Sequence, residues 1–264
     1  MLFNISPLPK LTAPQISFAG EFLNVVDSDG WEAAFLESGT IRFTGDPGLV
    51  DVFLVANGKA GGELRDVSGG IAEYFYYSGK GGDGGNYAVM TVTLLPDVDY
   101  TLTIGAESSL TGSGLSISTV ANGAAGATGG ASGMVHVWQT GSWHGSIDQH
   151  PRKGNDGIYA YNDPSDTVRI PEFSGKRFCA SGGGGDACWP AGNLYESADV
   201  RGGETDGGDG GSIRNVNGSN VTSAPKSGGA NTGSGGGGGI NGPYDSAASA
   251  AGGTGVCFMR QHRG

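Results

Sequence analysis

The chain has 264 residues, and 53 of them are glycine, about one in five where about 7% is usual. Only 16% of residues are charged, but 26 are acidic against 15 basic, for a net charge of −11. This composition excludes a highly charged disordered tail, and the acidic balance opposes binding to nucleic acid or anionic membranes through charge alone. The glycines are clustered without a three-residue period and proline is scarce, which excludes collagen.

The first thirty residues are expected to form an extended arm. Residues 1–30 contain Pro7, Pro9 and Pro14 and show no regular hydrophobic period. We therefore predict an N-terminal attachment arm over 1–30 and one glycine-rich domain over 31–264. The start of the sequence lacks early basic residues and a long apolar core, so no secretory signal is expected. No apolar run approaches the roughly 18 residues of a membrane-spanning helix.

Strand patterns dominate the region from residue 31 to about residue 130. β-branched and aromatic runs bounded by Gly, Pro and Asp occur at 39–44, 50–55, 87–94 and 100–104. The last two runs alternate along their length and flank a turn at Pro96, which predicts a β-hairpin. No window shows the apolar spacing of an amphipathic helix. We therefore expect an all-β fold with a β-sandwich-like body and little or no helix.

The second half of the chain differs in composition from the first. Residues 135–179 are poorer in glycine and carry three of the four histidines, which predicts a long inserted loop region. Unbroken glycine runs follow at 182–185 and 235–239. Such runs form either flexible linkers or extended helices with three residues per turn, whose backbone groups bond to neighbouring segments. Because glycine has no Cβ, the second arrangement allows close backbone packing.

Motifs for catalysis are not found. The nearest approach to a nucleophile elbow, Gly130-Ala131-Ser132-Gly133, has the wrong spacing. Neither Lys80 nor Lys176, each of which follows a glycine, is followed by the Ser or Thr of a phosphate-binding loop. We therefore expect no enzymatic activity, no catalytic residues and no cofactor.

Two clusters contain residue types that can bind metals. His136, His144 and His150 lie near Asp148 and Asp156, but their spacing matches no standard metal site, so hydrogen bonding or ligand contact is favoured. The acidic residues Asp199, Glu204, Asp206 and Asp209 lack the calcium-binding repeat, so solvated surface charge is favoured. No metal is expected.

Two cysteines flank the first glycine run. Cys179 and Cys188 are either bridged or two small buried thiols, and the lack of an export signal favours the thiols.

Aromatic residues in the irregular segments are the candidates for binding. Tyrosine and tryptophan offer rigid contact area with a polar group, and the neighbouring Ser, Asn and Gly offer adaptable hydrogen bonds. The alternative is that these rings fold back into a small core beneath long loops. The candidate receptor-binding residues are Trp138, Trp143, His144, Tyr159, Tyr161, Trp189, Tyr195 and Tyr244.

The order of these parts resembles a known family. A Ser-Gly-Thr strand at 38–43 and an apolar strand at 50–55 lead into the glycine stretch 79–85, and a strand at 256–258 follows the last glycines. From about Gly30 to Arg260 the chain resembles the glycine-rich domains of bacteriophage tail fibres, tail tips and related virion proteins. The resemblance implies a β-sandwich that supports packed polyglycine helices, with variable loops at the distal end that contact the host.

The resemblance also implies a role and partners. The protein would be a virion tail component, assembled in the host cytoplasm, and a receptor-binding adhesin for bacterial polysaccharide or an outer-membrane protein. Its arm would bind other virion tail proteins within an oligomeric assembly. The alternatives are a purely structural decoration or tail assembly protein, and a glycan-degrading enzyme, for which the sequence reveals no carboxylate pair.

Overall fold

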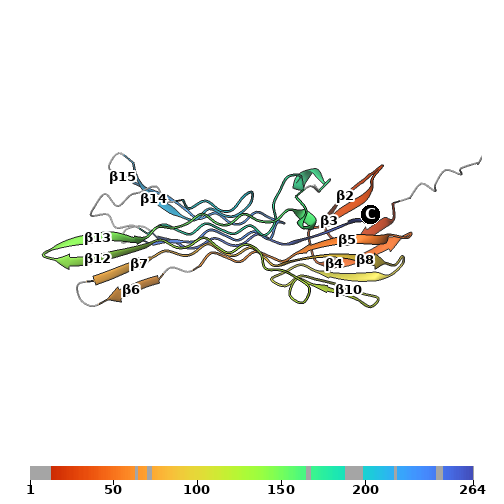
Figure 1. Cartoon of the computed structure of the whole chain (residues 1–264), viewed down its shortest axis with the longest axis horizontal. Helices are drawn as coiled ribbons and strands as arrows, with labels where there is room; N and C mark the ends of the chain where they lie inside the picture. Colours follow the sequence, from red (N-terminus) through yellow and green to blue (C-terminus); the bar gives the residue numbers. More distant parts are fainter. Residues whose placement is uncertain are drawn as a thin grey trace, which may run out of the picture.

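The computed structural model describes residues 13–62, 65–69, 73–164, 168–187, 199–216, 219–241 and 246–263. Figure 1 shows an elongated molecule, with a β-sandwich at one end, β-hairpins at the other and extended glycine-rich segments between them. Helix is limited, over this part of the chain, to the 3₁₀ turns η1 (Ala160–Asn162) and η2 (Pro171–Phe173). The predicted all-β fold is confirmed.

The sandwich consists of two antiparallel five-stranded sheets. The first contains, in spatial order, β1 (Gln15–Phe18), β4 (Gly39–Thr44), β9 (Asp99–Thr103), β10 (Ser109–Gly112) and β11 (Leu115–Ser118). The second contains β2 (Phe22–Asp27), β3 (Gly30–Phe35), β18 (Val256–Gln261), β5 (Gly48–Val55) and β8 (Tyr87–Leu94). Their inner faces pack Phe35, Phe43, Leu54, Tyr100 and Met259 into one core.

The second sheet is covered on both faces. Val52 and Leu54 of β5 face the first sheet, whereas Phe53 and Val55 pack with Phe258 against the segment 158–179. Strands covered on both faces read as continuous apolar runs, which is why β5 and β18 lack the alternation seen in β4. The molecule therefore has three layers at this end.

Two expectations about the sandwich are wrong. Residues 15–27 do not belong to an arm, because β1 pairs with β4 and β2 pairs with β3; residues 1–12 lie outside the described residues. The predicted hairpin of β8 and β9 is also wrong, because β8 pairs with β5 and β9 pairs with β4 and β10. The turn between them crosses from one sheet to the other, and the Leu95 amide donates to the Tyr100 hydroxyl there at 2.7 Å. Strands on facing sheets show the same alternation as paired strands, since each has one buried face.

The predicted inserted loop over 135–179 divides into three parts. β12 (Met134–Thr140) and β13 (Ser142–Gln149) form a hairpin, residues 150–157 run through the glycine-rich middle, and residues 158–164 and 168–179 cover the sandwich. One stretch of chain therefore reaches both ends of the molecule.

The distal end carries the remaining strands. β6 (Arg65–Gly69) and β7 (Glu73–Tyr77) join the β12–β13 hairpin in a four-stranded sheet of order β13-β12-β7-β6, here called the tip sheet. The hairpin of β14 (Ser212–Val216) and β15 (Ser219–Ser223) projects at the same end of the molecule (Figure 1). A short pair, β16 (Ile240–Asn241) and β17 (Ser246–Ala247), completes the strands of the described chain.

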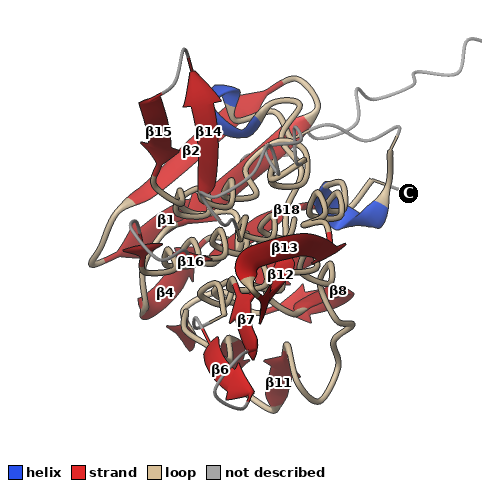
Figure 2. Cartoon of the chain, turned by 90° about the vertical axis from the view of Figure 1, so that its left-hand side faces the viewer, coloured by secondary structure: helices blue, strands red, loops and turns tan. Residues whose placement is uncertain are grey.

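The middle of the molecule is a bundle of extended segments without a side-chain core, seen end-on as coils in Figure 2. Successive amides of Gly182, Gly183 and Gly184 donate to three different neighbouring segments, and carbonyls of the same run accept from two others. A segment surrounded on every side has no room for a Cβ at any position. The unbroken runs 182–185 and 235–239 are therefore the inner segments of the bundle rather than flexible linkers.

Segments at the outside of the bundle keep a side chain at every third residue. Lys80, Asp83 and Asn86 interrupt the glycines of 79–86, and amides of the glycines between them donate to other segments. This spacing is that of a helix with three residues per turn, one side of which faces water. The bundle thereby holds the sandwich and the hairpins at fixed opposite ends.

Candidate functional site

The tip sheet has one buried face. Val135 and Val137 of β12 alternate on this face and pack against Ala187 and Tyr76. Residues of β12 between these valines point to the opposite side, because successive side chains of a strand alternate.

The opposite face carries a row of aromatic rings. Phe75 of β7 and His136 of β12 are register partners, and their rings stack with centroids 4.4 Å apart and planes 6° apart. Tyr77 stands two residues along β7, with its ring 6.4 Å from that of Phe75 and inclined by 27°. All three side chains are partly exposed.

A row of polar side chains lies next to the rings on β13. Ser146 is the register partner of His136, and its hydroxyl donates to the Asp148 carboxylate at 2.8 Å. His144 occupies the same side of β13 two residues earlier, and both His144 and Asp148 are exposed. We call this surface the tip face; it consists of Phe75, Tyr77, His136, His144, Ser146 and Asp148.

The structure places some of the sequence-predicted residues on the tip sheet. Trp138 pairs in register with His144, and Trp143 with Gln139, so the backbones of both tryptophans belong to the hairpin; their side chains are outside the description. Three further candidates, Trp189, Tyr195 and Tyr244, lie outside the described residues.

Tyr159 and Tyr161 lie on the segment that covers the sandwich, not on the hairpins. Tyr159 is 37% exposed and sits under the Arg177 guanidinium, whose Nη2 donates to its hydroxyl at 3.1 Å. Tyr161 is only 7% exposed and packs against Phe53, so its expected place on an exposed contact surface is corrected. Its hydroxyl donates to Glu32, which is fully buried, at 3.2 Å.

Buried charge fixes this covering segment to the second sheet. Glu32 also accepts from the Arg169 amide at 2.8 Å, and the Arg169 side chain pairs with Asp27. The Arg260 guanidinium lies 3.7 Å from the centre of the Tyr161 ring. Buried ions are tolerated where they are paired and hydrogen-bonded, so this network gives the segment a specific position.

Asp51 extends the network toward the surface. Its carboxylate accepts from Thr91 at 2.7 Å, contacts His262 Nδ1 at 2.7 Å and pairs with Arg260 at 3.3 Å. Burial alone would raise the pKa of Asp51, but the hydrogen bonds from Thr91 and His262 and the nearby positive charges outweigh it and lower the pKa.

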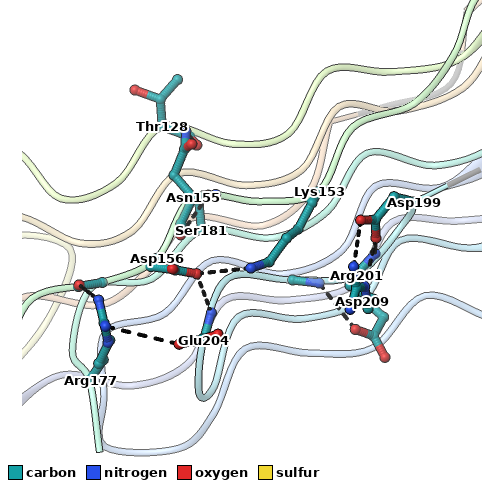
Figure 3. Close-up of polar contacts among 12 residues, drawn as sticks. Thr128, Lys153, Asn155, Asp156, Arg177, Ser181, Asp199, Arg201, Glu204 and Asp209 are labelled. Carbon is teal, nitrogen blue, oxygen red and sulfur yellow. Dashed lines mark hydrogen bonds and ion pairs between the residues drawn. The ribbon is translucent and has the colours of Figure 1, made fainter.

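The acidic cluster lies along the flank of the bundle (Figure 3). Asp199 forms two hydrogen bonds with Arg201, and Asp209 accepts from Lys226 at 2.8 Å. A little further along, the Glu204 amide donates to Asp156. This amide is the main cause of the lowered pKa of Asp156. Asp156 and Asp209 therefore join neighbouring segments, whereas Asp199 pairs within its own segment.

Possible metal ligands and thiols are the remaining groups with reactive side chains. Within the described ranges, no three His, Cys, Asp or Glu side chains converge on a point that could hold a metal ion. Cys179 is a free, buried thiol, and burial raises its pKa; its possible partner Cys188 lies outside the description.

Sequence reasoning missed the ring stack. The run Glu73–Tyr77 contains four aromatic residues in a row, which is a strand signal, but it is not among the expected strands. The pairing of Phe75 with His136, sixty residues later, has no local signal.

No described helix is long and apolar enough to cross a membrane. No curated protein and no solved structure matches the chain. One family model matches, over residues 36–262, and it is described as a glycine-rich domain. The matched span covers most of the chain, from the end of the third strand to the end of the last, and so includes both the bundle and the tip sheet. The chain therefore belongs to the glycine-rich domain family.

Proposed function

We propose that the protein is a tail tip or tail fibre component of a bacteriophage virion and binds the surface of the bacterial host with its distal hairpins. The observation that carries this proposal is the separation of the two ends. The sandwich holds β1 and β18, the first and last described strands, whereas the tip sheet and the β14–β15 hairpin project at the far end of the bundle (Figure 1).

The construction of the bundle supports such a role. Its backbone amides donate to adjacent segments at distances mostly between 2.7 and 3.1 Å, so little backbone is available for pairing with a protease. The hairpins leave from the ends of these segments, so their surface sequence can vary without disturbing the interior. The sandwich end would then bind other virion tail proteins.

The test is binding of fluorescently labelled protein to a panel of intact bacteria. Saturable binding, and inhibition of phage adsorption by excess protein, are the expected results. In a shortened variant, a two-residue turn replaces residues 138–144 of the hairpin and so keeps Val137 paired with Gly145; it should fold but lose binding. Tyr159→Ala, which changes an exposed aromatic residue away from the hairpins, is the matched control and should bind normally.

The proposal fails if no bacterium is bound, or if the shortened variant binds as well as the parent. A structural subunit without receptor contact would give a different pattern, in which the shortened variant no longer enters virions.

A further inference from the structure

We propose that the tip face binds a neutral glycan. In this assignment Phe75, Tyr77 and His136 contact the C–H surfaces of sugar rings, and Ser146 and Asp148 form hydrogen bonds with sugar hydroxyls. The inference rests on the proposed function and names the ligand class of the same end of the molecule.

The aromatic row is held in place before any ligand arrives. The rings of Phe75 and His136 stack on adjacent strands, and Tyr77 stands beside Phe75 at a small angle. Rings that are fixed by their neighbours lose little side-chain freedom on binding, which lowers the entropic cost of association. Pyranose rings have C–H groups that pack well against aromatic carbon, and these three side chains remain partly exposed.

The polar row supplies the complementary groups one strand away. The Ser146 hydroxyl donates to Asp148, which orients a carboxylate that has further lone pairs for hydroxyl donors. Charge-assisted bonds of this kind are stronger than bonds between neutral groups. From His144 to Asp148 the row spans about 13 Å at the rise of a strand, enough to follow more than one sugar unit.

Charge selects among glycans. The polar row carries the exposed carboxylate of Asp148, and the chain as a whole has a net charge of −11. Both oppose glycans rich in uronic acid, sialic acid or phosphate. A protein epitope fits this surface less well. Protein contacts depend on desolvated pockets that hold a few large side chains. The tip face is instead a sheet surface, with aromatic rings on β7 and β12 and polar groups on β13.

The experiment uses the full chain and bacteria that it binds. One sample of cells is oxidised with periodate, which cleaves the vicinal diols of sugars, and another is digested with protease. We expect periodate to abolish binding and protease to leave it intact. Neutral polysaccharide purified from the same cells should bind the protein in calorimetry, with an affinity that changes little between low and high salt.

Variants locate the site. Phe75→Ala and Asp148→Asn should each weaken polysaccharide binding about tenfold or more, as expected for a central contact. Asp148→Asn changes one exposed group and preserves the fold, so it keeps the test valid if Phe75→Ala destabilises the sheet. Tyr159→Ala is the control and should bind like the parent.

The outcomes separate the two proposals. If no bacterium is bound, the proposed function fails. If binding survives periodate but not protease, the host-binding function stands and the glycan inference is overturned. If polysaccharide binds but both tip-face variants bind like the parent, the tip face is not its site and the inference is equally overturned.

Discussion

Replacing one inner glycine by alanine tests whether backbone packing stabilises the bundle. At Gly184 an added Cβ would lie 1.7 Å from the carbonyl oxygen of Ala131, and this atom belongs to a hydrogen-bonded backbone that cannot swing aside. Contacts of a Cβ closer than 3.0 Å are essentially never found, so the two segments would have to separate by about 1.3 Å.

That separation has a calculable cost. The two segments are joined directly by the Gly130 amide, which donates to the Gly182 carbonyl, and by the Gly133 amide, which donates to the Gly185 carbonyl, both at 2.9 Å. Widening either distance by about 1.3 Å exceeds the range of a hydrogen bond. Each buried group left without a partner costs about 1–3 kcal/mol, so Gly184→Ala should lower the free energy of unfolding by about 2–6 kcal/mol. This is a large part of the total stability of an ordinary domain.

The measurement is urea unfolding followed by circular dichroism. The control is Gly105→Ala, where the nearest atom, the Glu107 carbonyl oxygen, would be 3.5 Å from the new Cβ. That variant should change stability by less than about 1 kcal/mol, because the methyl group fits and the unfolded chain loses freedom. If the two variants unfold within 1 kcal/mol of each other, the bundle is not held by close backbone packing and the reasoning is refuted.

Three further results are expected from the buried groups at the sandwich end. The free energy of unfolding should decrease as the pH falls below about 4, because the lowered pKa of Asp51 favours the folded state only while its carboxylate is ionised. In Asp51→Asn this decrease, measured by urea unfolding, should be smaller. A decrease as large as that of the parent protein would contradict the role given to Asp51. Cys179 and Cys257, whose pKa values are raised by burial, should resist a thiol reagent until the protein is unfolded, so titration of the native chain should count at most one of its three cysteines. Tyr161→Phe should destabilise the chain by about 1–3 kcal/mol in the same unfolding assay, because it leaves buried Glu32 without its hydroxyl donor; an unchanged midpoint would show that the bond is not needed.

The sequence left two alternatives for the glycine runs, flexible linkers and packed extended helices, and the structure shows the packed helices. An unbroken run such as 182–185 is surrounded on every side by the backbones of other segments. An interrupted run such as 79–86 has such neighbours on some sides only, and its other side faces water. In 79–86 the side chains Lys80, Asp83 and Asn86 recur every three residues, which is the period of the extended helix. This spacing in the sequence therefore identifies 79–86 as an outer segment of the bundle. The sandwich strands at 39–44, 50–55 and 87–94 were also located correctly, because each has a buried face.

What failed depended on contacts between distant parts of the chain. Nothing near Tyr161 indicates burial, since its partner Glu32 is more than a hundred residues earlier and its own backbone is left-handed, with φ at 55°. The same is true of β1, a four-residue strand that becomes regular only by pairing with β4. Short strands and irregular segments take their structure from what they contact, which local composition does not encode.

The two ends of the molecule therefore depend on different kinds of interaction. At the sandwich, stability comes from apolar side chains, and a change at Phe53 or Phe258 disturbs a shared core. In the bundle, the segments interact through backbone atoms, and these atoms are the same in every glycine of a run. A hairpin that leaves such a bundle is supported by hydrogen bonds that do not depend on its own side chains. For that reason the residues of the tip face can be selected for what they bind, with the fold maintained elsewhere.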